Sequence, residues 1–189
     1  ADDTNDNLNQ VRLDGWGSSY TYDSDALANF TNSITIYNKQ TASATYTSNI
    51  TLGLAPDGDF VAVDAVNAIL TMTPNTLSGD FEVVFSFTDH IISTAAVDAN
   101  IETSFRITDG STNSNPIKVQ HRIDGTGLAA GDQFEMCVPV VVRHIFTNLT
   151  AGTARTFTLQ KRITAFTAMD THDTDGATTN VLYMTAVKT

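Results

Sequence analysis

The residues of this chain best suited to chemistry are its acidic clusters, its four histidines and its single cysteine. The densest cluster of possible ligands is the segment Asp170-Thr-His172-Asp173-Thr-Asp175-Gly176. Hard cations such as Ca²⁺ bind several oxygens on a tightly turned loop, which an Asp-rich segment ending in Gly can supply. The spacing differs from that of an EF-hand, and no Glu follows at the required distance. We interpret the segment as a solvated turn, with a weak Ca²⁺ site as the alternative.

The histidines stand apart from one another in the sequence. His90, His121, His144 and His172 have no Cys or His partner at the spacing of a zinc site. His121 and His144 fall on predicted strands, where packing or an interface is expected for them. Cys137 lies in a Val-rich strand and is predicted to be an inert buried thiol. The sequence therefore predicts no zinc site and no cofactor, and the weak Ca²⁺ site at residues 170–176 stays only as the alternative to a prediction of no metal.

A glycine-rich stretch from Gly125 to Gly131 is superficially similar to a dinucleotide-binding loop. Its third Gly comes one place too late, and a strand-like segment follows where a phosphate site needs the N-terminus of a helix. We predict a plain connection between strands. No nucleophile elbow, zinc-protease or catalytic-cysteine motif occurs, and we expect no enzymatic activity.

Composition favours strands over helices. The chain holds 30 Thr against three Glu and four Lys, and Thr is a strand former whereas Glu and Lys favour helices. Short alternating segments recur at the spacing of a two-sheet sandwich. We expect an all-β fold, a two-sheet antiparallel β-sandwich of the jelly-roll kind. A short N-terminal arm (residues 1–14) would precede a single domain (residues 15–189).

Alternation of apolar and polar residues marks the individual strands, because successive side chains on a strand point to opposite faces. Residues 46–54 follow this pattern, and residues 60–72 are ambiguous between a strand and a helical turn, with the strand favoured. The segment from Ala130 to Arg162 predicts a long hairpin closed by a tight turn that contains Gly. The remaining predicted strands are residues 34–37, 81–88, 101–108, 117–123 and 181–187.

The charge of the chain excludes some partners. A net charge of −11, carried mainly by Asp in turn-rich stretches, predicts a soluble and self-repelling surface. The ten basic residues form no stripe that could follow phosphates, so a nucleic-acid partner is not expected. No apolar run approaches the roughly 18 residues of a membrane span.

Two of the predicted strands, residues 134–146 and 181–187, are apolar on both faces. A lone sandwich buries only one face of a strand, so the second face needs a cover. A loop or the N-terminal arm could supply it, but we favour a symmetric subunit interface. The residues expected near the axis of a homotrimer are Val141, Ile145, Leu182 and Met184, or their opposite-face partners Tyr183 and Val187.

Three segments near the end of the chain carry a resemblance to a known family. Phe146-Thr-Asn-Leu-Thr-Ala-Gly152, Thr156-Phe-Thr-Leu-Gln-Lys-Arg162 and Val181-Leu-Tyr-Met-Thr-Ala-Val187 resemble the last third of jelly rolls of the tumour-necrosis-factor/C1q-like kind. These jelly rolls recur in structural proteins of tailed bacteriophages. The resemblance implies a homotrimer that binds the major capsid protein as a capsid cement (decoration) protein on the surface of the virion, or that forms a fibre tip.

An alternative rests on the first half of the chain. Ser78-Gly-Asp-Phe-Glu-Val-Val-Phe-Ser-Phe87 is similar to lectin-like, concanavalin-type sandwiches. That similarity implies a fibre tip or carbohydrate-binding module that recognises a host glycan. Such a module needs exposed aromatic side chains, and the candidates are Trp16, Tyr20, Tyr22, Tyr37 and Tyr46.

The N-terminal arm is polar and has no period, so alone it cannot bury enough apolar area to offset the cost of ordering. Its apolar anchors are Leu8, Val11 and Leu13. Their spacing suits an extended segment laid along a neighbouring surface. We expect these three residues to contact the capsid.

Overall fold

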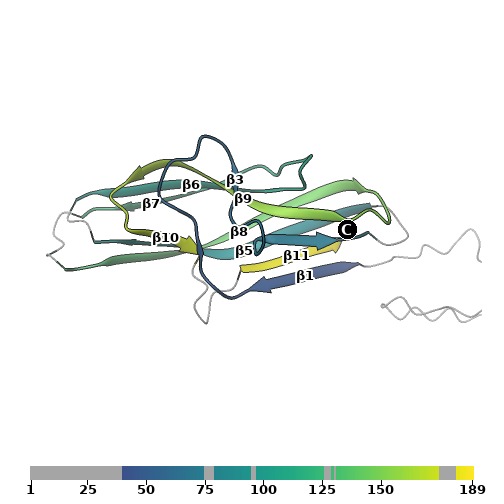
Figure 1. Cartoon of the computed structure of the whole chain (residues 1–189), viewed down its shortest axis with the longest axis horizontal. Helices are drawn as coiled ribbons and strands as arrows, with labels where there is room; N and C mark the ends of the chain where they lie inside the picture. Colours follow the sequence, from purple (N-terminus) through teal and green to yellow (C-terminus); the bar gives the residue numbers. More distant parts are fainter. Residues whose placement is uncertain (1–39, 75–78, 95–96, 126–128, 130, 175–181) are drawn as a thin grey trace, which may run out of the picture. The chain divides into compact units, whose positions relative to one another are not determined.

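Eleven antiparallel β-strands make up the described part of the chain, and no helix occurs there. The computed structural model describes residues 40–74, 79–94, 97–125, 129, 131–174 and 182–189 (Figure 1). Consequently, no described residue belongs to a helix long and apolar enough to cross a membrane. The strands are β1 (Thr41–Tyr46), β2 (Ile50–Thr51), β3 (Val61–Ala62), β4 (Ile69–Met72), β5 (Gly79–Ser93), β6 (Ala99–Thr108), β7 (Ile117–Ile123), β8 (Phe134–Leu149), β9 (Arg155–Thr167), β10 (Thr171–Thr174) and β11 (Leu182–Lys188).

The strands form two sheets that face each other (Figure 1). Sheet A has the order β1-β11-β5-β10-β2, and β8 pairs with the other edge of β5. Both β11 and β10 pair with the same edge of β5, β11 along its first half and β10 near its end. Sheet B has the order β3-β9-β6-β7, with β4 also paired to β9.

The pairing of the strands is concentric along the sequence. β6 pairs with β7, β5 with β8, β4 with β9, and β1 with β11. A chain folded in half in this way and then rolled into two sheets is a jelly roll. The predicted all-β jelly-roll sandwich is therefore confirmed, while the predicted boundary after residue 14 lies outside the described residues.

The predicted hairpin over residues 130–162 is wrong. Its two strands exist as β8 and β9, but β8 pairs with β5 in sheet A, and β9 pairs with β6 in sheet B. Both strands have an apolar inward face, so they lie across the core from each other, where the rings of Phe146 and Phe157 are 4.8 Å apart. The connection between them turns at Gly152, whose φ of 72° suits a residue without Cβ.

Two other segments differ from the sequence prediction. Residues 46–54 do not form one strand, because β1 ends at Tyr46 and β2 covers only Ile50–Thr51. Residues 60–72 divide into β3 and β4 around a single turn. The Asp64 carboxylate holds this turn by accepting hydrogen bonds from the backbone N–H groups of Val66 and Asn67 at 2.7 and 3.0 Å. A side chain that satisfies the backbone in this way competes with the strand ladder.

Inward side chains form two apolar clusters between the sheets. The large cluster contains five fully buried phenylalanines: Phe81, Phe85, Phe105, Phe146 and Phe157. The small cluster lies at the other end of β5 and contains Ile91, Ala99, Ile101, Ile123, Ile163 and Met169. Each large apolar side chain contributes about 1.5–3 kcal/mol through burial, so these clusters supply the main stabilisation of the sandwich.

Candidate functional site

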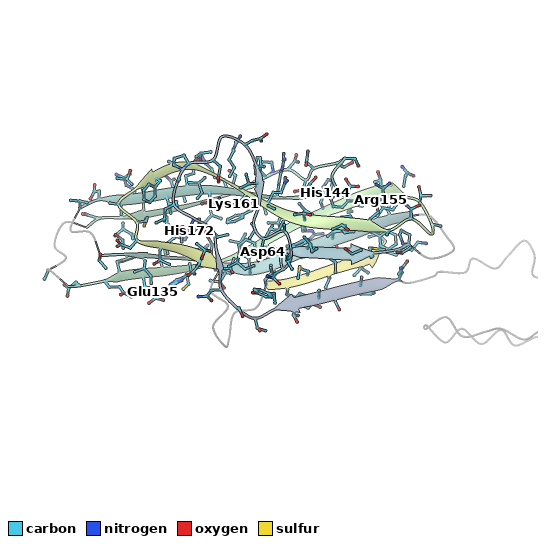
Figure 2. All side chains as sticks on the ribbon, in the orientation of Figure 1. Asp64, Glu135, His144, Arg155, Lys161 and His172 are labelled. Atoms are coloured by element: carbon cyan, nitrogen blue, oxygen red, sulfur yellow. The ribbon has the colours of Figure 1, made fainter. Side chains whose placement is uncertain are left out.

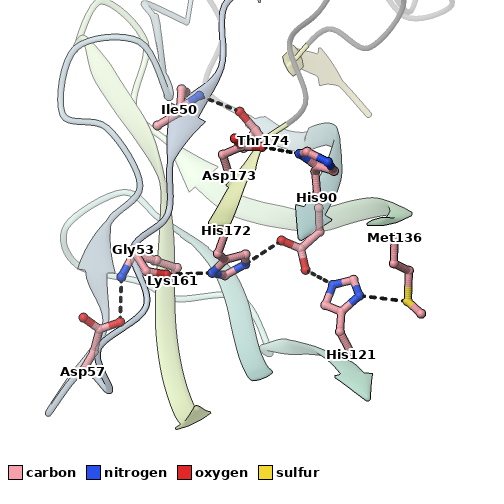
Figure 3. A network of polar contacts seen from close by, with 11 residues as sticks. Ile50, Gly53, Asp57, His90, His121, Met136, Lys161, His172, Asp173 and Thr174 are labelled. Carbon is pink, nitrogen blue, oxygen red and sulfur yellow. Dashed lines mark hydrogen bonds and ion pairs between the residues drawn. The ribbon is translucent and has the colours of Figure 1, made fainter. Parts of the chain in front are cut away.

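A polar layer separates the two apolar clusters. On the inward face of β5, Asp89 stands between Phe87 of the large cluster and Ile91 of the small one. The same arrangement recurs on neighbouring strands, where one inward position carries a polar side chain. The polar layer consists of Asp89, Thr103, His121, Lys161 and His172, all buried. Figure 3 shows His121, Lys161 and His172 with their polar contacts.

Asp89 is the centre of this layer and has no exposed surface. Its Oδ1 lies 2.8 Å from Nε2 of His172 on β10, and its Oδ2 lies 2.7 Å from Nε2 of His121 on β7. The outer nitrogen of each ring also has a partner, which is the Gly53 carbonyl oxygen at 2.9 Å for His172 and the Met136 sulfur at 3.2 Å for His121. Because β10 belongs to sheet A and β7 to sheet B, the carboxylate links the two sheets.

The hydrogen bonds of this group keep Asp89 ionised. The Asp89 carboxylate and the Gly53 carbonyl are both acceptors, so each ring nitrogen of His172 faces an acceptor oxygen. Burial by itself raises the pKa of Asp89, but hydrogen bonds and attraction from His121 and His172 outweigh it and hold that pKa below its ordinary value. The result is a hydrogen-bonded His121–Asp89–His172 group that is closed off from solvent. Since no substrate can reach it, we assign it the role of fixing one sheet against the other.

Lys161 completes the layer from sheet B. Its Nζ donates to Oδ2 of Asp57 at 2.8 Å, and the same oxygen accepts from the backbone N–H of Ile163 at 2.9 Å. A buried ammonium needs such a partner, because an unpaired charge in the interior costs several kcal/mol. Among the described residues, the Thr103 hydroxyl has no hydrogen-bond partner.

A second histidine cluster lies on the opposite face of sheet A, turned outward. His90 places Nδ1 2.8 Å from Oδ1 of Asp173 and Nε2 2.9 Å from Oε1 of Glu135. Burial by itself lowers the pKa of His90, but hydrogen bonds and attraction from the two carboxylates outweigh it and raise that pKa above its ordinary value. Cys137 stands opposite His90 in the β5–β8 register and is exposed. Figure 2 shows Glu135, which lies at the beginning of β8.

A surface with exposed apolar side chains lies farther along this outward face. We call it the outer patch, and it comprises the outward residues Glu82, Val84, Ser86, Val141, Arg143, Ile145, Tyr183, Thr185 and Val187. Three large apolar side chains in it, Val141, Ile145 and Tyr183, are 46–48% exposed. Val141 and Tyr183 flank the small Ser86, since both are in register with it. Arg143 and Glu82 form an ion pair at 2.5 Å, so the charges within the patch cancel.

The structure divides the six predicted interface residues between two environments. Val141, Ile145, Tyr183 and Val187 belong to the outer patch. Leu182 and Met184 are 3% and 2% exposed and lie in the large apolar cluster, so they are not available to a second subunit. The prediction was wrong for these two residues, because side chains alternate along β11 and Leu182 and Met184 point inward on the same side as Ala186.

Two predictions about reactive residues are wrong. The segment at residues 170–176 is not a solvated turn, because Thr171–Thr174 form β10 between β5 and β2. Its two described carboxylates have separate partners, since Asp170 accepts from the Thr94 backbone N–H at 2.6 Å and Asp173 contacts His90. Cys137 is exposed and not buried, because it has the outward parity of β8.

Sequence reasoning missed both histidine clusters, although a signal for the inner one existed. Asp89 continues the inward series of Phe85 and Phe87, and His121 lies between the inward residues Val119 and Ile123. An ionisable residue at an inward position needs a buried partner. No comparable signal in the sequence pairs His90 with Glu135, because strand order had to be known first.

The aromatic residues proposed for glycan binding gain no support. Tyr46 is half-buried and packs against the large apolar cluster, and Trp16, Tyr20, Tyr22 and Tyr37 lie outside the described residues. Leu8, Val11 and Leu13, predicted to contact the capsid, also lie outside them. A polar hollow of about 300 Å³ on sheet B has no aromatic residue among those that line it, which are Asp98, Ala99, Asn100, Gln120, Arg122 and Thr167.

Comparison with known proteins gives weak structural likenesses. The sequence matches no described protein family and no curated protein. A structure of T=1 particles derived from infectious bursal virus is 12% identical with a TM-score of 0.26, over 94% of this chain and 35% of that one. A structure of infectious bursal disease virus strain Gt is 13% identical with a TM-score of 0.26, over 77% of this chain and 39% of that one. A virus-like particle of extra small virus from the giant freshwater prawn Macrobrachium rosenbergii has a chain that is 10% identical with a TM-score of 0.23. The likeness covers 95% of this chain and 96% of that one.

All three structures are of viruses or of particles derived from viruses. The present chain spans less than two fifths of the length of the first two chains. TM-scores at this level carry no argument about topology or activity. The jelly-roll fold is therefore established by the strand pairing and not by these likenesses.

Proposed function

We propose that this protein is a non-enzymatic structural protein of a virion, a homotrimeric jelly roll that binds the major capsid protein and stabilises the capsid surface as a cement protein. The observation that carries the proposal is the outer patch. An exposed apolar surface across three adjacent strands marks an interaction site. The virion setting follows from the resemblance of residues 146–187 to jelly rolls of phage structural proteins.

Charge favours a second copy of this chain as the occupant of the outer patch. Each copy carries a net charge of −11, so two copies repel one another over most of their surfaces. In the outer patch the Arg143–Glu82 pair leaves no net charge. Val141, Ile145 and Tyr183 would be buried there without desolvating an unpaired ion. Copies can therefore meet on this face without bringing unpaired charges together.

Light scattering on the full chain tests the trimer. A monomer has a mass of 20.3 kDa, and a trimer would have about three times that mass. The double variant Val141→Lys/Tyr183→Lys should be a folded monomer, because both side chains are half-exposed before assembly. Val66→Lys is the control, since Val66 is 76% exposed outside the outer patch and should leave the trimer intact. A wild-type monomer at micromolar concentration contradicts the proposal.

Purified virions test the placement on the capsid. An antibody against residues 41–189 should label the whole outside of intact particles in electron microscopy. Labelling confined to tail tips would favour a fibre tip that recognises a host glycan. Deletion of residues 1–14 should reduce occupancy on particles while leaving the sandwich folded, if Leu8, Val11 and Leu13 anchor it. Full occupancy after the deletion would contradict that anchoring role.

A further inference from the structure

Three side chains with metal-binding atoms meet on the outward face of sheet A, beyond the outer patch. His90 comes from β5, and Glu135 and Cys137 come from the neighbouring β8. Cys137 is opposite His90 in the register, and Glu135 precedes it by two residues on the same face. The His90 ring nitrogen, the Glu135 carboxylate oxygen and the Cys137 sulfur all lie within 4.8 Å of one another.

His90 is oriented as a metal ligand. Its Nδ1 faces the Asp173 carboxylate at 2.8 Å, which leaves Nε2 directed at Glu135. Histidines that bind metals almost always donate the other ring N–H to a carboxylate or carbonyl, which fixes the tautomer and the direction of the ring. Asp173 is held on β10, between β5 and β2, so this support belongs to the folded sheet. The histidine is thus positioned before any metal arrives.

The donor atoms select the metal. One nitrogen, one thiolate sulfur and one carboxylate oxygen suit Zn²⁺, whereas Ca²⁺ and Mg²⁺ prefer oxygen alone. Bond lengths of about 2.0 Å to nitrogen and 2.3 Å to sulfur place tetrahedral ligands about 3.5 Å apart. Closing from 4.8 Å requires a shift of roughly 1 Å, which exposed side chains on β8 make by rotation about their χ angles.

We propose that His90, Glu135 and Cys137 form a Zn²⁺ site with three protein ligands and a fourth position open to solvent. His90 binds through Nε2 and Cys137 as the thiolate. The protons on Nε2 and on the thiol pass to the buffer as the metal enters, so binding releases protons and involves no change of oxidation state. Asp173 acts as a positioning residue, and the Glu135 side chain, 54% exposed, moves from His90 to share the metal with it.

Metal titration of the reduced full-length protein tests this site. Zn²⁺ affinity is measured by competition with a chromogenic chelator, and Co²⁺ is added separately as a spectroscopic probe. The wild type should bind one Zn²⁺ per chain, and its Co²⁺ form should show a thiolate-to-metal charge-transfer band in the near ultraviolet. Glu135→Gln and Cys137→Ser should each weaken Zn²⁺ binding by more than about a hundredfold, and Cys137→Ser should abolish the band.

Two further variants separate ligands from bystanders. Asp173→Asn should weaken Zn²⁺ binding about 10–100-fold while the charge-transfer band remains, as expected of a group that acts through His90. His144→Gln is the matched control, because His144 lies on the same strand but on its inward side, against Phe146. It should bind Zn²⁺ like the wild type.

Circular dichroism separates loss of binding from loss of folding. Glu135 and Cys137 are both exposed, so their variants should keep the wild-type spectrum and melting temperature. If the wild type binds no Zn²⁺ at micromolar concentration, the proposal is overturned. Retention of one Zn²⁺ at wild-type affinity by both folded variants would overturn it equally, because the metal would then be held elsewhere.

Discussion

Replacing Asp89 by Asn removes one negative charge from the centre of the polar layer while keeping the shape of the side chain. The carboxylate accepts from His172 at 2.8 Å and from His121 at 2.7 Å. An amide can accept through its oxygen from one ring only, and its NH₂ group then faces the N–H of the other. One of the two rings would therefore lose its acceptor.

The expected cost follows from the number and burial of these contacts. A hydrogen bond to a charged group contributes about 1.5–3 kcal/mol, and Asp89 makes two of them with no solvent exposure. Breaking a buried ion pair by removing one partner costs about 3–5 kcal/mol, which agrees with that sum. For a chain of this size the melting temperature should fall by roughly 6–20 °C.

Thermal and urea unfolding followed by circular dichroism measure this loss. Asp98→Asn is the control, because Asp98 is exposed, and its substitution should change the stability by less than about 0.5 kcal/mol. If the two variants have the same melting temperature, the reasoning is refuted. The rings of His121 and His172 would then find other partners, and the polar layer would not hold the sheets together.

Three further predictions concern pH, salt and one turn. The pKa of Asp89 is lowered in the folded state, so the advantage of the wild type over Asp89→Asn should be full above the ordinary carboxylate pKa of 3.8. This difference in stability should shrink as the pH falls from 3.8 through the lower pKa that Asp89 has in the folded state. Urea unfolding at a series of pH values measures it, and a difference that persists at the lowest pH would contradict the prediction. Raising NaCl from 0.1 to 1 M shortens the screening length from about 10 to 3 Å, so the melting temperature should rise as the repulsion among a net charge of −11 weakens. A fall would mean that attractive ion pairs dominate. Gly152→Ala should destabilise the fold by about 1–2 kcal/mol in urea unfolding, because φ is 72° at this residue. Gly58→Ala is the control and should be near neutral, because a Cβ there meets open space and φ is not positive. Equal effects of the two substitutions would show that the backbone at residue 152 favours glycine no more than the backbone at residue 58.

Alternation along single strands could be predicted from the sequence, but pairing between strands could not. The inward series of β5 and the two apolar faces of β8 follow from period-two spacing. Which strand lies beside β8 depends on contacts far apart in the sequence, so the predicted hairpin of β8 with β9 was wrong.

The outward histidine cluster was invisible for the same reason. His90, Glu135 and Asp173 come from three strands that are distant in the sequence and adjacent only in sheet A. Strand β10 itself could not be predicted, because its Thr, His and Asp residues have a composition that is typical of a turn. Burial of His172 and pairing with β5 override that local preference.

The concentric pairing described above sets an order in which the chain can fold. The β6–β7 hairpin closes a short loop, whereas β1 and β11 pair Thr41 with Val187 across almost the whole domain. Loop-closure entropy makes such distant pairings slow. β11 also lies between β1 and β5, so sheet A stays open and β1 lacks its partner until residues 182–188 arrive. During synthesis the edge of β5 would be exposed to other nascent chains for that time, and a ribosome that stalls before residue 182 would release a protein prone to aggregate.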